Sequence, residues 1–183
     1  MAQLINDSAN QHINPQQNGF HPQRLNHAVL YVADLEKSVD FYSRVMNMEV
    51  VATAPRMSAA FLRIKGSRNH HDLGLMRSPN QTRKTPGSVG LYHLAWQVAT
   101  LEELKLAKDV LLSEKSYYGE ANHGATLSIY GYDPNGIDFE IMWMLPYSDW
   151  GTYTNRAVVE HLNLDEALKK WPDTNTFEYP QRD

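Results

Sequence analysis

The stretch that decides the fold occurs twice in this chain. Residues 25–36 read LNHAVLYVADLE and residues 91–102 read LYHLAWQVATLE, which places His27 and His93 at equivalent positions, 66 residues apart (93 − 27). A second pair, DLGLM at 72–76 and DFEIM at 138–142, has the same offset (138 − 72). Two separate matches at one offset indicate a duplicated unit of about sixty residues.

Each copy of the unit predicts one strand, one helix and then three strands. In the first copy a β-type run at 28–32 follows His27, and Asp34 is a typical N-cap for the helix that comes next. In the second copy Thr100 and Glu103 have the spacing of a capping box. The further strands are expected at 48–53, 59–64 and 71–76, and then at 117–120, 125–131 and 136–143.

The repeat also predicts the domain boundaries. Residues 1–23 are polar and rich in Gln and Asn, which favours a disordered tail. Residues 24–145 form the predicted single domain, with module one at 24–78 and module two at 90–145. Residues 146–183 differ in character, and their aromatic residues predict an extension, with a short helix at 165–170, that packs on the domain or on a partner subunit.

Composition excludes several classes of protein and of site. The net charge is −4 and basic residues form no run, which argues against nucleic acid as a partner. No apolar stretch is long enough to cross a bilayer, and the N-terminus lacks a secretory signal, so we expect a cytoplasmic protein without membrane contact. Because cysteine is absent, any metal must be held by nitrogen and oxygen ligands.

The two repeated histidines suggest such a metal site. Packing of the copies about a pseudo-twofold axis would bring His27 and His93 to one cleft. Side-chain alternation along 138–142 places Glu140 on the face opposite Phe139. Two imidazoles and one carboxylate form the ligand set of non-haem Fe(II) oxygenases, in which the remaining positions stay open. A single strand histidine is more often a hydrogen-bonded core residue, but the equivalence of the two favours a metal centre.

The repeat, together with DPNG at 133–136, resembles the vicinal-oxygen-chelate superfamily from residue 25 to residue 144. This superfamily includes glyoxalase I, fosfomycin and bleomycin resistance proteins, and extradiol dioxygenases. The resemblance implies an α+β fold in which paired βαβββ modules form an open, cupped mixed sheet around a metal. It also implies that His27, His93 and Glu140 are the metal ligands.

Within the superfamily, three more residues resemble those of one-domain proteins similar to catechol 2,3-dioxygenase. His71 lies in NHHDLGL at 69–75, where these enzymes carry a histidine close to bound O₂, and His70 is the alternative in the same segment. His123 and Tyr130 lie in NHGATLSIY at 122–130, where a histidine and a tyrosine contact the substrate hydroxyls. The resemblance therefore implies catalytic roles for His71, His123 and Tyr130.

The activity implied is the cleavage of a small aromatic diol by O₂ beside its hydroxyl groups, which gives a ring-opened semialdehyde. Fe(II) is the expected cofactor, with Mn(II) as the alternative, since the two share ligand preferences. The better-known relatives carry a second pair of modules that helps to cover the site. Here the C-terminal extension or a second subunit would do so, and we expect a homodimer.

Three other classes remain open from the sequence, one of which is a member of the fold that has lost its activity. A glyoxalase-type lyase or isomerase would use Zn or Ni as a Lewis acid without O₂. It would normally need a fourth protein ligand, and Gly74, which is equivalent to Glu140 (140 − 66), supplies none. A small-molecule binding protein of the resistance type would not need the three ligands that are present here. The sequence does not specify which diol is cleaved, or on which side.

Overall fold

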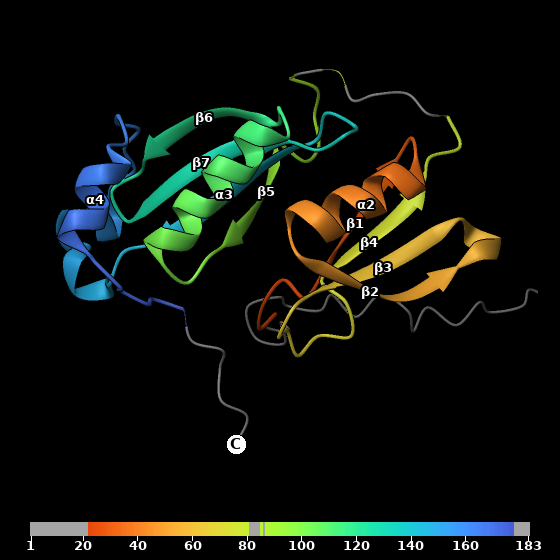
Figure 1. The fold of residues 1–183 in the computed structure, drawn as a ribbon, viewed down its shortest axis with the longest axis horizontal. Helices are drawn as coiled ribbons and strands as arrows, with labels where there is room; N and C mark the ends of the chain where they lie inside the picture. Colours follow the sequence, from red (N-terminus) through yellow and green to blue (C-terminus); the bar gives the residue numbers. More distant parts are fainter. Residues whose placement is uncertain (1–21, 81–84, 86, 178–183) are drawn as a thin grey trace, which may run out of the picture.

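The computed structural model describes residues 22–80, 85 and 87–177, which form two βαβββ modules and a C-terminal extension (Figure 1). Nearly all of the tail predicted to be disordered lies outside these described residues. Module one contains β1 (Ala28–Val32), α2 (Leu35–Val45), β2 (Met48–Ala54), β3 (Ala59–Ile64) and β4 (Leu73–Arg77). Module two contains β5 (His93–Gln97), α3 (Leu101–Ser113), β6 (Tyr117–Asn122), β7 (Thr126–Tyr132) and β8 (Asp138–Met144). The extension carries α4 (Leu164–Lys170).

The strand pairings repeat from one module to the other. The two four-stranded sheets have the orders β1-β4-β3-β2 and β5-β8-β7-β6, with one parallel pair in each. Val29 pairs with Gly74 in the first sheet, and Ala95 pairs with Glu140 in the second. Each partner is 66 residues from its equivalent (95 − 29 and 140 − 74), so the predicted duplication and the α+β class are confirmed.

Side-chain caps begin both long helices where the sequence predicts. The Asp34 side chain accepts a hydrogen bond from the backbone N–H of Lys37 at 3.0 Å. Thr100 and Glu103 form the reciprocal capping box. Such caps pair backbone N–H groups that a helix start leaves without an internal partner.

Each sheet buries the face that its helix covers. Leu62, Leu73 and Leu75 are fully buried in module one, and Phe139 and Trp143 in module two are equally inaccessible. The alternation along β8 is as predicted, with Phe139 in the core and Glu140 on the other side of the sheet. We call the face of each sheet that points away from its helix the open face, and the candidate functional side chains lie there.

The two modules are joined on the helix side by an inter-module latch, formed by Ser38, Tyr42, Asp133 and Asn135. The Tyr42 hydroxyl donates to the Asp133 carboxylate at 3.2 Å, and the Asn135 amide donates to the Ser38 hydroxyl at 3.0 Å. Asn135 also accepts from the backbone N–H of Ala33 at 2.8 Å. The DPNG segment therefore forms the turn between β7 and β8 and also binds module two to α2.

The C-terminal extension packs on module two of its own chain. Asn122 and Glu160 exchange two backbone hydrogen bonds of 2.9 Å, and the rings of Trp143 and Trp171 lie 5.6 Å apart. Leu162 and Leu164 are buried. None of the helices in the described part of the chain is both long and apolar enough to cross a bilayer.

Candidate metal centre

Module two brings together His93 and Glu140 on its open face. His93 begins β5 and Glu140 lies on the neighbouring strand β8, so the parallel register places their side chains next to each other. The His93 Nε2 atom lies 3.0 Å from Glu140 Oε2. Glu140 is only 9% exposed, and the His93 Nδ1 atom is buried without a hydrogen-bond partner. A buried carboxylate and an unsatisfied imidazole are costly unless something binds them, which points to a ligand site.

Tyr130 and His123 extend this group. Tyr130 pairs directly with Glu140 across β7 and β8, and its hydroxyl lies 3.4 Å from Glu140 Oε1. His123 Nε2 lies 2.6 Å from the same hydroxyl. Burial, and then the nearby Glu140 charge, raise the pKa of Tyr130 to about 12. The phenol therefore keeps its proton at neutral pH and is available as a hydrogen-bond donor.

Module one gathers His27 and His71 on its own open face. Their ring centroids are 4.4 Å apart, and His71 also packs edge-on against Phe61 at 5.0 Å. The Asn69 amide joins the two segments, because it donates to the Asn26 carbonyl at 2.9 Å and to the Asp72 carboxylate at 2.6 Å. The loop that carries His71 is thus fastened to the residue before His27.

The structure also separates His71 from His70. His71 is half-buried and faces His27, whereas His70 is exposed and contacts His71 from outside. Burial, together with the charges of His27 and His70, lowers the pKa of His71 below its usual value. His71 is therefore neutral near neutral pH. One of its ring nitrogens donates a hydrogen bond and the other accepts one.

We distinguish the two groups, because no hydrogen bond, ion pair or ring contact joins their side chains among the described residues. Among the described residues, no cluster of three or more His, Asp or Glu side chains is arranged to hold a metal ion. That His27, His93 and Glu140 hold one metal ion therefore stays a prediction. The latch holds the modules together through α2 and the β7–β8 turn. We call the two groups half-site one (His27, His71) and half-site two (His93, Tyr130, Glu140).

Half-site two fits two adjacent positions around a divalent ion. Neighbouring ligands of an octahedral ion, each about 2.1 Å from it, lie about 3.0 Å from one another. The His93–Glu140 separation is 3.0 Å. Imidazole nitrogen and carboxylate oxygen suit first-row divalent ions. Half-site two therefore offers two side chains of the correct chemistry for neighbouring ligand positions.

Gly74 shows why module one offers no equivalent of Glu140. A Cβ atom at this position would lie 3.1 Å from one methyl carbon of Val29 and 3.5 Å from the Phe61 ring. The open face of module one is therefore closed at this point by apolar side chains. The division into one ligand from module one and two from module two stays a prediction.

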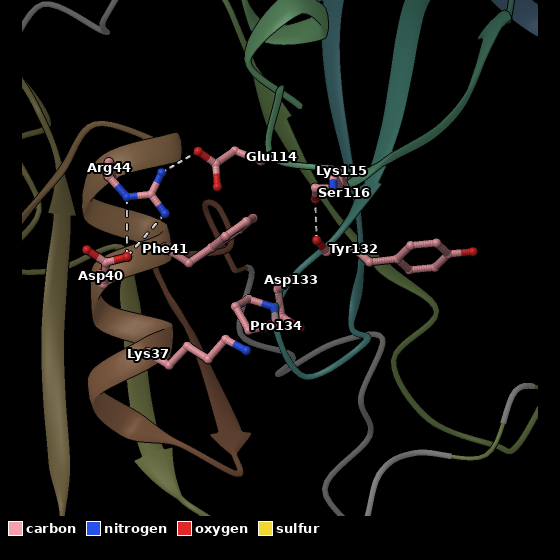
Figure 2. Close-up of a pocket in the computed structure, with 10 residues that line it drawn as sticks. All are labelled: Lys37, Asp40, Phe41, Arg44, Glu114, Lys115, Ser116, Tyr132, Asp133 and Pro134. Atoms are coloured by element: carbon pink, nitrogen blue, oxygen red, sulfur yellow. Dashed lines mark hydrogen bonds and ion pairs between the residues drawn. The ribbon is translucent and has the colours of Figure 1, made fainter. Parts of the chain in front are cut away.

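The cavity between the modules has a different character. It holds about 270 Å³ and lies between α2 and the β7–β8 turn, where Figure 2 shows the Arg44 guanidinium between the carboxylates of Asp40 and Glu114. None of the histidines, nor Tyr130 or Glu140, lines it. Arg44 already pairs with Asp40 and Glu114, and the cavity contains none of the candidate ligands, so we assign the chemistry to the open faces instead.

Two contributions to the site were not predicted from the sequence. Asn135 joins the modules through its side chain, and the Val158 carbonyl lies 3.0 Å from His123 Nδ1. The DPNG motif signals a turn but not its distant partners. A backbone carbonyl carries no sequence signal, since every residue has one.

Known proteins show the same sequence pattern. Residues 24–141 match the model of the Glyoxalase/Bleomycin resistance protein/Dioxygenase superfamily. The chain is 33% identical over 122 residues to biphenyl-2,3-diol 1,2-dioxygenase 3 of Rhodococcus globerulus, a match that covers 64% of this chain and 62% of that protein. It is 30% identical over 151 residues to catechol-2,3-dioxygenase of Bacillus subtilis (strain 168), with 78% and 52% covered. The chain thus spans less than two thirds of these curated relatives.

Solved structures share the fold at lower identity. A glyoxylase/bleomycin resistance protein/dioxygenase domain from Frankia sp. EAN1pec superposes with a TM-score of 0.60 at 17% identity, covering 69% of this chain and 96% of that one. A fosfomycin resistance protein from Listeria monocytogenes superposes with a TM-score of 0.55 at 22% identity, covering 71% and 99%. These likenesses concern the fold alone. The chain belongs to the glyoxalase/bleomycin resistance protein/dioxygenase superfamily.

Proposed function

We propose that this protein is an extradiol dioxygenase, which cleaves a catecholic ring with O₂ and releases a ring-opened semialdehyde. The observation that carries the proposal is the group on one open face that joins His93 and Glu140 to Tyr130 and His123. Two metal ligands next to a phenol and an imidazole provide both a place for an ion and a path for a proton. The dioxygenase names of the relatives support the same activity.

The metal ligands in this proposal are His27, His93 and Glu140, with Fe(II) as the ion. A bound Fe(II) would supply open positions where a diol and O₂ bind next to each other. Mn(II) has similar ligand preferences and would occupy the same residues.

The remaining side chains would orient the substrate and handle its protons. A diol that binds with its hydroxyls toward half-site two meets the Tyr130 hydroxyl, and His123 behind it accepts the proton that the substrate releases. His71 is neutral and shares an open face with His27. It would donate or accept a hydrogen bond on the O₂ side of the substrate.

The proposal includes a homodimer, because the residues described in one chain form no group of three metal-ligating side chains. β1 and β5 stand at the ends of their sheets, and each leaves one edge unpaired among the described strands. Exposed apolar side chains lie beside the half-sites, with Tyr31 65% and Tyr92 73% accessible. Unpaired edges with apolar side chains favour association. A second copy would thus present its half-site one to half-site two of the first.

Oxygen uptake tests the proposed activity. The protein would be loaded with Fe(II) without oxygen and then mixed with catechol, alkylcatechols and arylcatechols in aerated buffer. We expect oxygen uptake together with a yellow ring-opened product, and loss of both in His93→Ala. The control is His161→Ala, since His161 is exposed on the extension and belongs to neither half-site.

The alternative classes give different results in the same assay. A lyase or isomerase would consume no oxygen and would work with Zn or Ni. A binding protein would bind the diol without releasing product. A protein that holds its metal in full and takes up no oxygen with any diol would contradict the proposed activity.

A further inference from the structure

The C-terminal extension holds His123 from the side opposite Tyr130. The His123 Nδ1 atom lies 3.0 Å from the Val158 carbonyl oxygen, and its Nε2 atom lies 2.6 Å from the Tyr130 hydroxyl. A carbonyl oxygen only accepts hydrogen bonds, so Nδ1 must carry a proton to make this contact. In the neutral ring Nε2 is then the unprotonated nitrogen, and it accepts the proton of Tyr130.

The residues on both sides of His123 are fixed by the same extension. Asn122 exchanges two backbone hydrogen bonds of 2.9 Å with Glu160. Gly124 has a φ of +83°, and a Cβ atom there would lie 2.3 Å from the Tyr153 ring. Only glycine permits the ring to approach the backbone this closely. The His123 ring is therefore held in place by residues 153–160, and not only by its own β6–β7 turn.

This contact decides the direction of the Tyr130 hydrogen bond. A hydroxyl has one proton, so Tyr130 cannot donate to His123 and to Glu140 at the same time. The Tyr130 hydroxyl lies 2.6 Å from His123 Nε2 and 3.4 Å from Glu140 Oε1. While His123 is neutral, the hydroxyl therefore donates its hydrogen bond to His123 across the shorter distance. The opposite tautomer, with the proton on Nε2, would leave the Val158 carbonyl without its donor.

We propose that residues 153–160 are a positioning element of the ring-cleavage site, in which the Val158 carbonyl fixes the tautomer of His123. A proton released by the substrate hydroxyl passes to Tyr130 as Tyr130 passes its own proton to His123 Nε2. The product is an imidazolium whose Nδ1–H still donates to Val158. This inference rests on the proposed function. The family model ends at residue 141, so the positioning group lies outside the matched region.

The tautomer can be measured directly by nitrogen NMR on full-length protein with ¹⁵N-labelled histidine, loaded with Zn²⁺ as a diamagnetic ion. We expect His123 in the Nδ1–H form in the unaltered protein. In Tyr153→Ala the ring against Gly124 is lost, and we expect a mixture of both tautomers. The matched control is Tyr147→Ala, because Tyr147 belongs to the same extension, is 74% exposed and packs on Trp150 instead.

A second variant covers the case in which Tyr153→Ala does not fold. Glu160→Pro removes the N–H that donates to Asn122 but leaves the Val158 carbonyl in the chain. We expect the same tautomer mixture. In oxygen uptake both variants should lose between about ten- and a hundredfold in kcat with little change in KM, since the proton acceptor is misplaced and the diol still binds.

The outcomes separate this inference from the proposed function. An Nε2–H ring in the unaltered protein, or an unchanged tautomer in both variants, would overturn the positioning role even if oxygen uptake is normal. An Nδ1–H ring in a protein that never consumes oxygen would overturn the proposed catalytic use of His123.

Discussion

The Glu140 carboxylate is almost inaccessible and contacts two other polar side chains, His93 and Tyr130. Among the described residues no lysine or arginine forms an ion pair with it, and a buried carboxylate in this situation is a costly arrangement that a bound cation would relieve. Among the candidate residues, Glu140 is thus the one whose charge most needs the proposed metal.

We predict that Glu140→Gln weakens metal binding at least tenfold. The amide of glutamine is uncharged, so it no longer offsets part of the positive charge of the metal ion. Two measurements check this prediction, the metal content after dialysis and the dissociation constant for Mn²⁺. Glu120→Gln is the matched control, since Glu120 lies in the same sheet and pairs with Lys108. Equal metal binding by Glu140→Gln and the unaltered protein would exclude Glu140 as a ligand.

Tyr130 tests the proton path at the same scale. We predict that Tyr130→Phe lowers kcat by about a hundredfold and keeps the metal, because the ring stays in the sheet while the hydroxyl that contacts His123 is lost. Steady-state oxygen uptake and metal analysis measure the two effects. Tyr132→Phe, on the same strand and 43% exposed, should behave like the unaltered protein. A fully active Tyr130→Phe would remove this residue from the mechanism.

At the scale of the elements, α2 is held to the β7–β8 turn by the buried contact of Tyr42 with Asp133. Burial, and then the Asp133 charge, raise the pKa of Tyr42 well above its usual value of 10. The folded state therefore favours the protonated phenol. This contribution to stability is complete below the unfolded pKa of about 10 and is lost as the pH rises toward the folded value.

We predict that the protein loses stability between about pH 9 and about pH 11, and that Tyr42→Phe reduces this loss. Near neutral pH the same variant should cost about 1–3 kcal/mol, because the hydrogen bond to a carboxylate is removed. Urea unfolding at each pH measures both effects. Tyr147→Phe serves as the control, since Tyr147 lies on the extension and is 74% exposed. A Tyr42→Phe protein with unchanged alkaline sensitivity would exclude this contact as the cause.

At the scale of the whole molecule, the question is whether the half-sites of two chains complete one another. Mixing His27→Ala with His93→Ala answers it. If the site is shared between copies, a mixed dimer has one damaged site that lacks both histidines and one site that is intact. Random exchange makes half of the dimers mixed, so about a quarter of the unaltered activity should return.

The matched control is a mixture of His93→Ala with Glu140→Gln, since both belong to half-site two. Each site in these mixed dimers would lack one of the two ligands, so no activity should return. Two variants that stay inactive in the first mixture after exchange, while the unaltered chain is a dimer, would show that each site is built within one chain.

The sequence by itself determined the local and periodic features of this protein. The 66-residue offset predicted the two modules and their equal register, and Asp34, Thr100 and Glu103 predicted where the helices begin. It also predicted that Glu140 and Phe139 face opposite sides of β8. These features depend on neighbouring residues and on strand alternation, which a sequence displays directly.

Only the tertiary structure decided which groups meet. It joined His93 to Glu140 and His71 to His27, but the described part of the chain contains no group of three metal-ligating side chains. It also placed the Val158 carbonyl on His123. The physical reason is that contacts between residues far apart in the chain, such as those of Asn135, join the modules. A backbone carbonyl is also the same at every residue. Neither feature produces a periodic pattern in the sequence.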